Sequence, residues 1–164
     1  MTLLPPPPEL TPSVLKLTGV GPRPVARAAA REAIQAALRQ WFGHAIALVE
    51  TPRGPRTDPA SAARDLRLSL TYAGDDAWIA FHRGPVGLDA CLLRDFPERA
   101  AVGALYLGGT PPDESAAEFA VRWARHEAAL KHGGLTLTEG VAPPAPPYLR
   151  SWTEAAAALA LAWS

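Results

Sequence analysis

Leucine alternates with polar residues along 66–72, and this period of two predicts a half-buried strand. A second strand is predicted over 77–82. The Gly-Asp-Asp turn at 74–76 lies between them, so the two segments predict a β-hairpin. A further apolar run at 86–88 leads directly into Asp89, which the pattern places at the end of a short strand.

Two longer segments have the composition and end signals of helices. Residues 24–42 are rich in alanine, arginine and leucine, begin at a proline and are followed by a glycine. Ser115 and Glu118 form a capping-box pattern that opens a second helix, which runs to residue 132 and stops at two glycines. A shorter helix is predicted over 96–107. In the first helix the expected apolar stripe is Val25, Ala29, Ala33, Ala36 and Leu38.

The rest of the chain contains many proline and glycine residues, which interrupt regular structure. Residues 1–23 hold many of the 18 prolines and predict an extended arm, which leaves 24–164 as a single domain. Strands are predicted at 45–49 and 135–137, and loops at 51–60 and 141–147. The last segment, 154–163, suits either a helix or a buried final strand, because periodicity does not separate the two over so short a run.

Composition narrows the class of protein. Hydrophobic residues make up 48% of the 164 residues, which is enough for a buried core. Sixteen basic residues balance sixteen acidic ones, so the chain lacks the basic field of a nucleic-acid binder. One cysteine, Cys91, excludes an internal disulfide. The N-terminus lacks a secretory pattern, and the run at 155–163 is shorter than the ~20 residues of a membrane span. We expect a cytoplasmic monomer without membrane partners.

Three polar residues, Asp89, Glu127 and Lys131, suggest a binding or catalytic site. Glu127 and Lys131 follow Trp123 at intervals of four, so all three share one helix face. By itself this spacing is typical of a solvated Glu–Lys pair, and Asp89 by itself is typical of a turn. Together, two carboxylates and a lysine suit a magnesium ion shared with a ligand's phosphates. Two such carboxylates repel each other without metal, so one is expected to have a raised pKa.

Three blocks occur in a specific order. They read LSLTYAG at 68–74, PVGLDAC at 85–91 and WARHEAALKHG at 123–133. In this order they resemble the phosphopantetheinyl transferase superfamily, in particular the type that activates surfactin synthetase. Its signatures are a Ser-His-Ser strand end, a Gly-Val-Asp-Ile-Glu strand end and a Trp-x-x-Lys-Glu-Ala-x-x-Lys helix. The resemblance covers roughly residues 24–163 and is strongest in the helix block.

The resemblance implies an α+β fold with a mostly antiparallel sheet and packed helices. It also implies two pseudo-equivalent helix–sheet halves, about 24–72 and 73–164. The implied reaction is Mg²⁺-dependent transfer of the phosphopantetheine arm of coenzyme A to a serine of an apo acyl or peptidyl carrier protein, as in secondary metabolite biosynthesis. Asp89 and Glu127 would bind the metal, Lys131 would contact the phosphates of coenzyme A, and Glu127 or a water it orients would accept the serine proton.

Further contacts to coenzyme A are expected from the first half. Arg56 follows Gly54 and Pro55 where the family has a Gly-Lys-Pro loop, and Tyr72 stands where the family has a phosphate-binding histidine. Arg31 and Arg83 are additional candidates, as are Arg27 and Arg67, because the guanidinium fork suits phosphate.

Some positions depart from the family pattern. Cys91 stands where larger members have a third carboxylate, and a thiol is a poor magnesium ligand. His126 replaces a lysine, and Tyr72 brings no positive charge. These departures leave a second function open, that of an impaired member that binds coenzyme A or a carrier protein without transfer.

Overall fold

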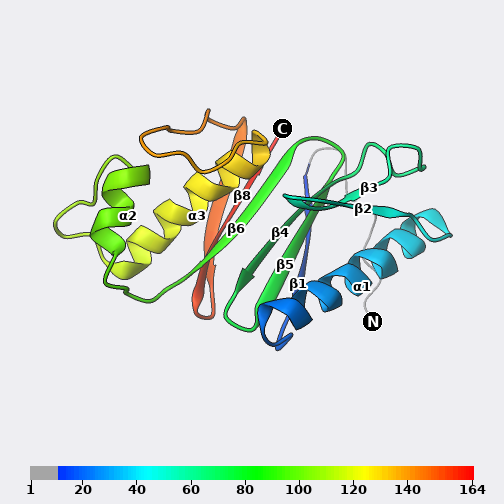
Figure 1. Ribbon diagram of the computed structural model, residues 1–164, viewed down its shortest axis with the longest axis horizontal. Helices are drawn as coiled ribbons and strands as arrows, with labels where there is room; N and C mark the ends of the chain where they lie inside the picture. The colour runs from blue at the N-terminus through cyan, green and yellow to red at the C-terminus, as the bar shows by residue number, and fades with distance from the viewer. Residues whose placement is uncertain (1–10) are drawn as a thin grey trace. The chain divides into compact units, whose positions relative to one another are not determined.

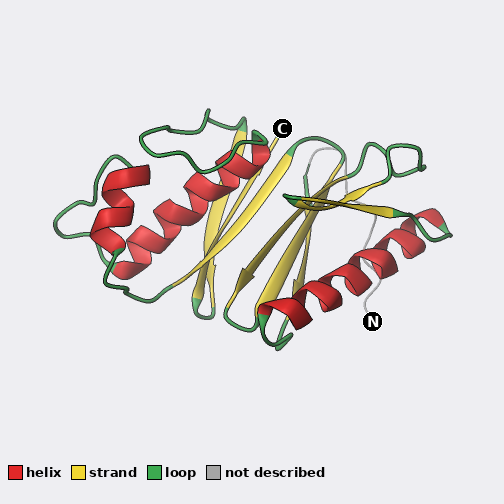
Figure 2. Cartoon of the chain, in the orientation of Figure 1, coloured by secondary structure: helices red, strands yellow, loops and turns green. Residues whose placement is uncertain are grey.

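The predicted hairpin is present in the computed structural model, which describes residues 11–164. Strands β4 (Arg67–Ala73) and β5 (Asp76–His82) pair antiparallel, with Leu68 opposite Phe81 and Leu70 opposite Ile79. The protein is α+β, with antiparallel sheets and helices packed against them (Figure 2). The chain divides into two compact units, Met1–Val86 and Gly87–Ser164, which are described separately.

The first unit contains a strand that the sequence did not predict. Strand β1 (Ser13–Leu17) pairs antiparallel with β5, so the sheet order is β1-β5-β4. The prediction of an extended arm over 1–23 is therefore wrong at 13–17, and its residues 1–10 lie outside the described part. The run SVLKL is too short to show a period, and its partners in β5 lie 60 to 68 residues further along the chain, so no local pattern marks it as a strand.

Helix α1 (Arg23–Phe42) packs against this sheet (Figure 1). Ile34 and Leu38 of the helix join Ile79 and Phe81 of β5 in one buried cluster. The predicted apolar stripe is correct at Leu38, which is buried, and Ala33 packs against the cluster, but it is wrong at Val25, which is 57% exposed. The residues that are buried are Ala26, Ala30, Ile34, Ala37 and Leu38.

A two-stranded hairpin completes the first unit. Strand β2 (Leu48–Thr51) begins later than the strand predicted at 45–49, and it pairs with β3 (Gly54–Thr57). The prediction of a loop over 51–60 is therefore wrong at 54–57. The sequence did not indicate this strand because it begins with a glycine and a proline, and both residues are rare in strands.

In the second unit the open question about the final segment is settled in favour of a strand. Strand β8 (Ala157–Trp163) pairs antiparallel with β7 (Tyr148–Glu154), which the sequence did not predict, and the sheet order is β6-β8-β7 with β6 (Val86–Leu92) at one edge. The strand predicted at 135–137 is wrong, since that segment is a loop, whereas 141–147 is a loop as predicted.

Two helices belong to the second unit, α2 (Arg99–Tyr106) and α3 (Ala116–His132). The capping box that opens α3 is present, because the Ser115 hydroxyl accepts from the Glu118 N–H and the Glu118 carboxylate accepts from the Ser115 N–H. Ala124 and Ala128 of α3 pack on Ala160 and Ala162 of β8. Such small side chains let helix and strand approach closely.

The three-stranded sheets of the two units have corresponding strand orders, because in each the first strand lies beside the last. Between the first strand and the final hairpin, the first unit has α1 and the β2–β3 hairpin, whereas the second has α2 and α3. The division after Val86 falls later than the expected boundary between residues 72 and 73, because the β4–β5 hairpin stays within the first unit. Within residues 11–164, no helix combines the length and the apolar character that crossing a membrane demands.

Candidate functional site

Strand β6 positions Asp89. The residue lies in the middle of this seven-residue strand, whereas the sequence placed it at a strand end. Side chains two apart in a strand share a face, so Gly87, Asp89 and Cys91 are on one side of β6. That side faces α3, since the backbone of α3 approaches Gly87 and Cys91 packs against the alanines of α3 and β8.

Gly87 is the residue that permits this close approach. A Cβ atom at this position would lie 2.0 Å from the carbonyl oxygen of Ala128 and 2.5 Å from the backbone nitrogen of His132. Both distances are shorter than any real contact, and both neighbours are backbone atoms that cannot swing away. The strand therefore runs directly against the C-terminal half of α3, where Glu127 and Lys131 are found.

Lys131 links the two elements. Its Nζ atom donates to Oδ1 of Asp89 at 2.7 Å and to the carbonyl oxygen of Leu88 at 3.0 Å. The side chain of Asp89 is 10% exposed and that of Lys131 33% exposed. The pair is largely withdrawn from water, so the simple interpretation of Lys131 as part of a solvated surface pair with Glu127 is wrong.

Glu127 lies one helical turn before Lys131 and is electrostatically coupled to Asp89. Burial raises the pKa of the Glu127 carboxyl, the negative charge of Asp89 raises it further, and the positive charge of Lys131 opposes the shift. The expectation that one of the two carboxylates has a raised pKa is confirmed, although burial is the larger cause. The structure thus brings Asp89, Glu127 and Lys131 together.

Trp123, which shares a face of α3 with Glu127 and Lys131, packs this helix against α2. Its ring meets that of Tyr106 edge-on with centroids 6.0 Å apart, and it stacks at 6.3 Å on Phe119. His126 stacks on the same tryptophan at 6.2 Å, and burial lowers the pKa of its imidazole. His126 therefore supplies no fixed positive charge at neutral pH.

Cys91 is chemically unsuited to a metal. Burial raises the pKa of its thiol to about 11, the charge of Asp89 adds to the shift, and Arg94 opposes it. Without a metal the thiol stays protonated at neutral pH, and sulfur is in any case a poor ligand for magnesium. Over residues 11–164, no three or more His, Cys, Asp or Glu side chains gather in a way that could hold a metal ion.

The other predicted coenzyme A contacts belong to the first unit. Arg31 forms an exposed ion pair with Glu50. Arg56 is exposed on β3 opposite Val49, and Arg83 is exposed just after β5. Among residues 11–86, no contact joins these three arginines into one cluster.

Tyr72 has basic neighbours that the sequence analysis only partly identified. Burial raises the pKa of its phenol, while Arg27 and Arg23 oppose the shift. The guanidinium of Arg23 lies 5.7 Å from the ring centroid. Arg23 was missed, although its spacing of four from Arg27 at the start of a helix is a usable signal. The contact of Lys131 with Leu88 was also missed, because a backbone carbonyl leaves no trace in the sequence.

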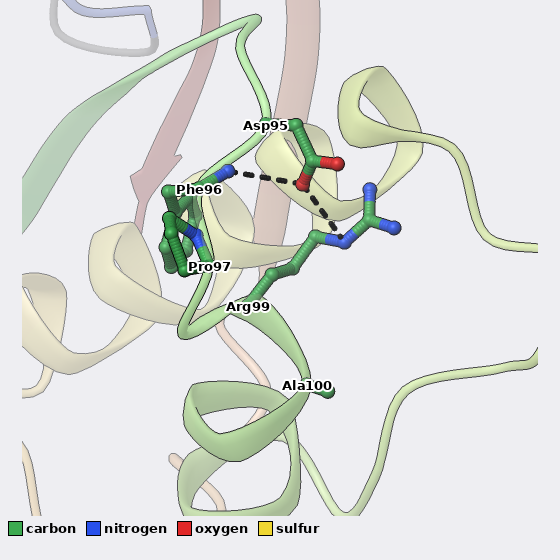
Figure 3. A pocket seen from close by; sticks show the side chains of 5 residues that line it. All are labelled: Asp95, Phe96, Pro97, Arg99 and Ala100. Carbon is green, nitrogen blue, oxygen red and sulfur yellow. Dashed lines mark hydrogen bonds and ion pairs between the residues drawn. The ribbon is translucent and has the colours of Figure 1, made fainter.

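A pocket in the second unit is lined by other residues (Figure 3). Asp95 accepts from the backbone N–H of Phe96 at 3.0 Å and pairs with Nε of Arg99 at 3.4 Å. Pro97 and Ala100 complete the lining. None of the candidate site residues is among them, so the pocket does not add to the site.

No protein-family model matches this chain, and no curated protein matches its sequence. The function is therefore inferred from the residues and their geometry.

Proposed function

We propose that the protein is a Mg²⁺-dependent phosphopantetheinyl transferase that moves the arm of coenzyme A onto a serine of an apo acyl or peptidyl carrier protein. The observation that carries the proposal is the cluster of Asp89, Glu127 and Lys131, which strand β6 and helix α3 bring together. These three residue types on these two elements are the ones that the resemblance assigns to the metal and the phosphates.

The donor set fits magnesium. Asp89 and Glu127 offer carboxylate oxygens, which Mg²⁺ prefers, and it commonly completes its shell with water and substrate phosphates. The negative charge of Asp89 acts on Glu127, so the two carboxylates lie within electrostatic reach of each other. Sulfur is a poor ligand for Mg²⁺, so we assign the metal to these two carboxylates and not to Cys91. When bound, the ion would neutralise charge on the diphosphate of coenzyme A.

The chain's own residues account for the proton and the phosphates. The serine oxygen forms a bond to the phosphorus that carries the pantetheine arm, and the phosphoanhydride bond breaks. Adenosine 3′,5′-bisphosphate leaves with the bonding electrons. Glu127, or a water it orients, accepts the serine proton. Lys131 stabilises charge on the phosphates.

Two features of the first unit support the same function. The strand order of its three-stranded sheet, with the first strand beside the last, recurs in the second unit, as expected of the pseudo-equivalent halves of a phosphopantetheinyl-transferase-like fold. The guanidinium carbon of Arg23 lies 5.7 Å from the centroid of the Tyr72 ring, and the charge of Arg27 also acts on this phenol, so positive charge is present beside the residue that replaces the family's histidine. The proposed phosphate contacts from this unit remain those predicted from the sequence, with Arg31, Arg56 and Arg83.

A transfer assay tests the proposal. The purified protein is incubated with Mg²⁺, coenzyme A and a panel of apo carrier proteins, and carrier mass is followed by mass spectrometry. Wild type should add the phosphopantetheine arm, and Glu127→Gln should not. Glu118→Gln is the matched control, because it makes the same change on the same helix at an exposed capping residue. If Glu127→Gln transfers as well as wild type does, Glu127 has no part in the reaction.

A second function is favoured by one observation. The Cys91 position offers a protonated thiol where a third metal carboxylate would stand in larger members. A member with only two carboxylates could bind coenzyme A or a carrier protein without transferring the arm. Calorimetric binding of coenzyme A with no mass gain on any carrier in the panel would favour this second function.

A further inference from the structure

The ammonium group of Lys131 is hydrogen-bonded to strand β6. Its Nζ atom donates to Oδ1 of Asp89 at 2.7 Å and to the carbonyl oxygen of Leu88 at 3.0 Å. Asp89 is buried, with 7% of the residue exposed, so water screens this ion pair poorly. A lysine whose only role was to bind the phosphates of a ligand would not need these contacts with Asp89 and Leu88.

The same ammonium also acts on the second carboxylate. Glu127 lies one helical turn before Lys131, and the charges of both Asp89 and Lys131 act on it. One positive charge is therefore placed among the two carboxylates that the proposed function assigns to Mg²⁺. A divalent ion that takes an oxygen of Asp89 meets this ammonium at close range, and two cations in a poorly hydrated site repel strongly.

We infer that Lys131 is an internal counter-cation for the Asp89–Glu127 pair, which excludes Mg²⁺ until the phosphates of coenzyme A draw the ammonium away. The metal and coenzyme A then bind as a pair. This inference rests on the proposed function, and it adds an order of binding and a determinant of metal affinity.

The side chain is suited to such an exchange. Lysine carries a compact charge on a flexible four-carbon stem, and 33% of the Lys131 side chain is exposed, so its head can swing toward an arriving phosphate. The diphosphate of coenzyme A also brings the negative charge that lets ammonium and metal share one site. Because coupling between two ligands is reciprocal, Mg²⁺ must raise the affinity for coenzyme A as much as coenzyme A raises that for Mg²⁺.

Mn²⁺ titration followed by electron paramagnetic resonance tests the inference without an activity assay. Free Mn²⁺ is measured against full-length wild type, Lys131→Met and Lys131→Gln, each with and without coenzyme A. Without coenzyme A, both variants should bind Mn²⁺ more tightly than wild type by about tenfold or more, a normal size for coupling between two ligands. Wild type should reach comparable affinity only when coenzyme A is present.

Controls separate this effect from general electrostatics and from misfolding. Arg125→Met removes one positive charge from the same helix at an exposed side chain that contacts Ser151, and it should leave Mn²⁺ affinity unchanged. Lys131→Gln keeps a hydrogen-bond donor next to Asp89, so it can still be tested if Lys131→Met does not fold. Circular dichroism measures the folding of both variants. Asp89→Asn combined with Lys131→Met should abolish the gain.

The outcomes distinguish the inference from the function on which it rests. Equal or weaker Mn²⁺ binding by both folded variants, with coenzyme A still raising the Mn²⁺ affinity of wild type, overturns the counter-cation role and leaves the transferase proposal standing. If neither variant binds Mn²⁺, and wild type with coenzyme A does not bind it either, the metal pair and the transferase proposal fail together.

Discussion

A Cβ atom on Gly87 would lie 2.0 Å from the carbonyl oxygen of Ala128, so strand β6 and helix α3 are in direct backbone contact. This contact is what brings Asp89 of the strand to Lys131 of the helix. The site therefore depends on a residue that carries no side chain and takes no part in the chemistry.

Gly87→Ala should destabilise the protein by about 1–3 kcal/mol, because the added methyl group forces strand and helix apart. Urea unfolding followed by circular dichroism measures the change. Gly133→Ala is the matched control, since its added Cβ would come no nearer than 3.5 Å to any atom and its φ of −73° suits alanine. That control should stay within about 1 kcal/mol of wild type. Equal stability of Gly87→Ala and wild type would contradict the close approach.

Glu127→Gln should stabilise the metal-free fold at neutral pH while it abolishes transfer. Because the folded pKa of Glu127 is raised, the folded state holds this proton to higher pH than the unfolded state does. The stability that this proton provides is present below the ordinary carboxyl pKa and is lost as pH rises through the folded value. The advantage of the variant should therefore be larger near pH 7 than near pH 4, as unfolding at both pH values can measure. An equal difference at the two pH values would show that Glu127 does not titrate as described.

Cys91 should react slowly with alkylating agents. With its pKa raised from 9.0 to about 11, the thiolate fraction near pH 8 is smaller by about a hundredfold than for an ordinary cysteine thiol. Mass spectrometry of iodoacetamide labelling measures the rate, and the same protein unfolded in urea provides the reference. Similar labelling rates in the folded and unfolded protein would mean that the thiol is neither buried nor affected by Asp89.

Arg56→Glu should weaken coenzyme A binding by roughly tenfold or more, the cost of losing a charge-assisted hydrogen bond to phosphate. Isothermal titration calorimetry measures the dissociation constant. Arg64→Glu is the control, because it makes the same change at an exposed arginine of the same unit that lies in a loop and not on β3. It should leave coenzyme A binding unaltered. An unchanged constant for Arg56→Glu would remove this residue from the phosphate contacts.

The sequence predicted the elements whose signals are local. The β4–β5 hairpin has a clear period of two and a turn, and α3 has a capping box, so both were recognised with nearly the observed bounds. Strands β1 and β7 were missed because each is defined by a partner strand rather than by its own pattern. The spacing of Glu127 and Lys131 likewise predicted a shared helix face.

What the sequence could not provide was the partner of Lys131. Spacing on a helix is as compatible with a solvated Glu–Lys pair as with a site, and only tertiary packing at Gly87 places Asp89 within 2.7 Å of the ammonium. The interpretation of Asp89 as a strand end failed for a related reason. The residues after it, Ala90, Cys91 and Leu92, continue strand β6, and the sheet decides where that strand stops.

Crystals of the protein grown with coenzyme A and Mn²⁺ would show where the metal binds, because anomalous scattering locates Mn²⁺. We expect one Mn²⁺ peak in contact with carboxylate oxygens of Asp89 and Glu127, at distances of about 2.1 Å, with diphosphate oxygens of coenzyme A completing its shell. Lys131 should then contact those phosphates in place of Oδ1 of Asp89. A metal peak away from these two carboxylates, or coenzyme A bound with its diphosphate elsewhere, would contradict the assignment of this cluster as a phosphopantetheinyl transfer site.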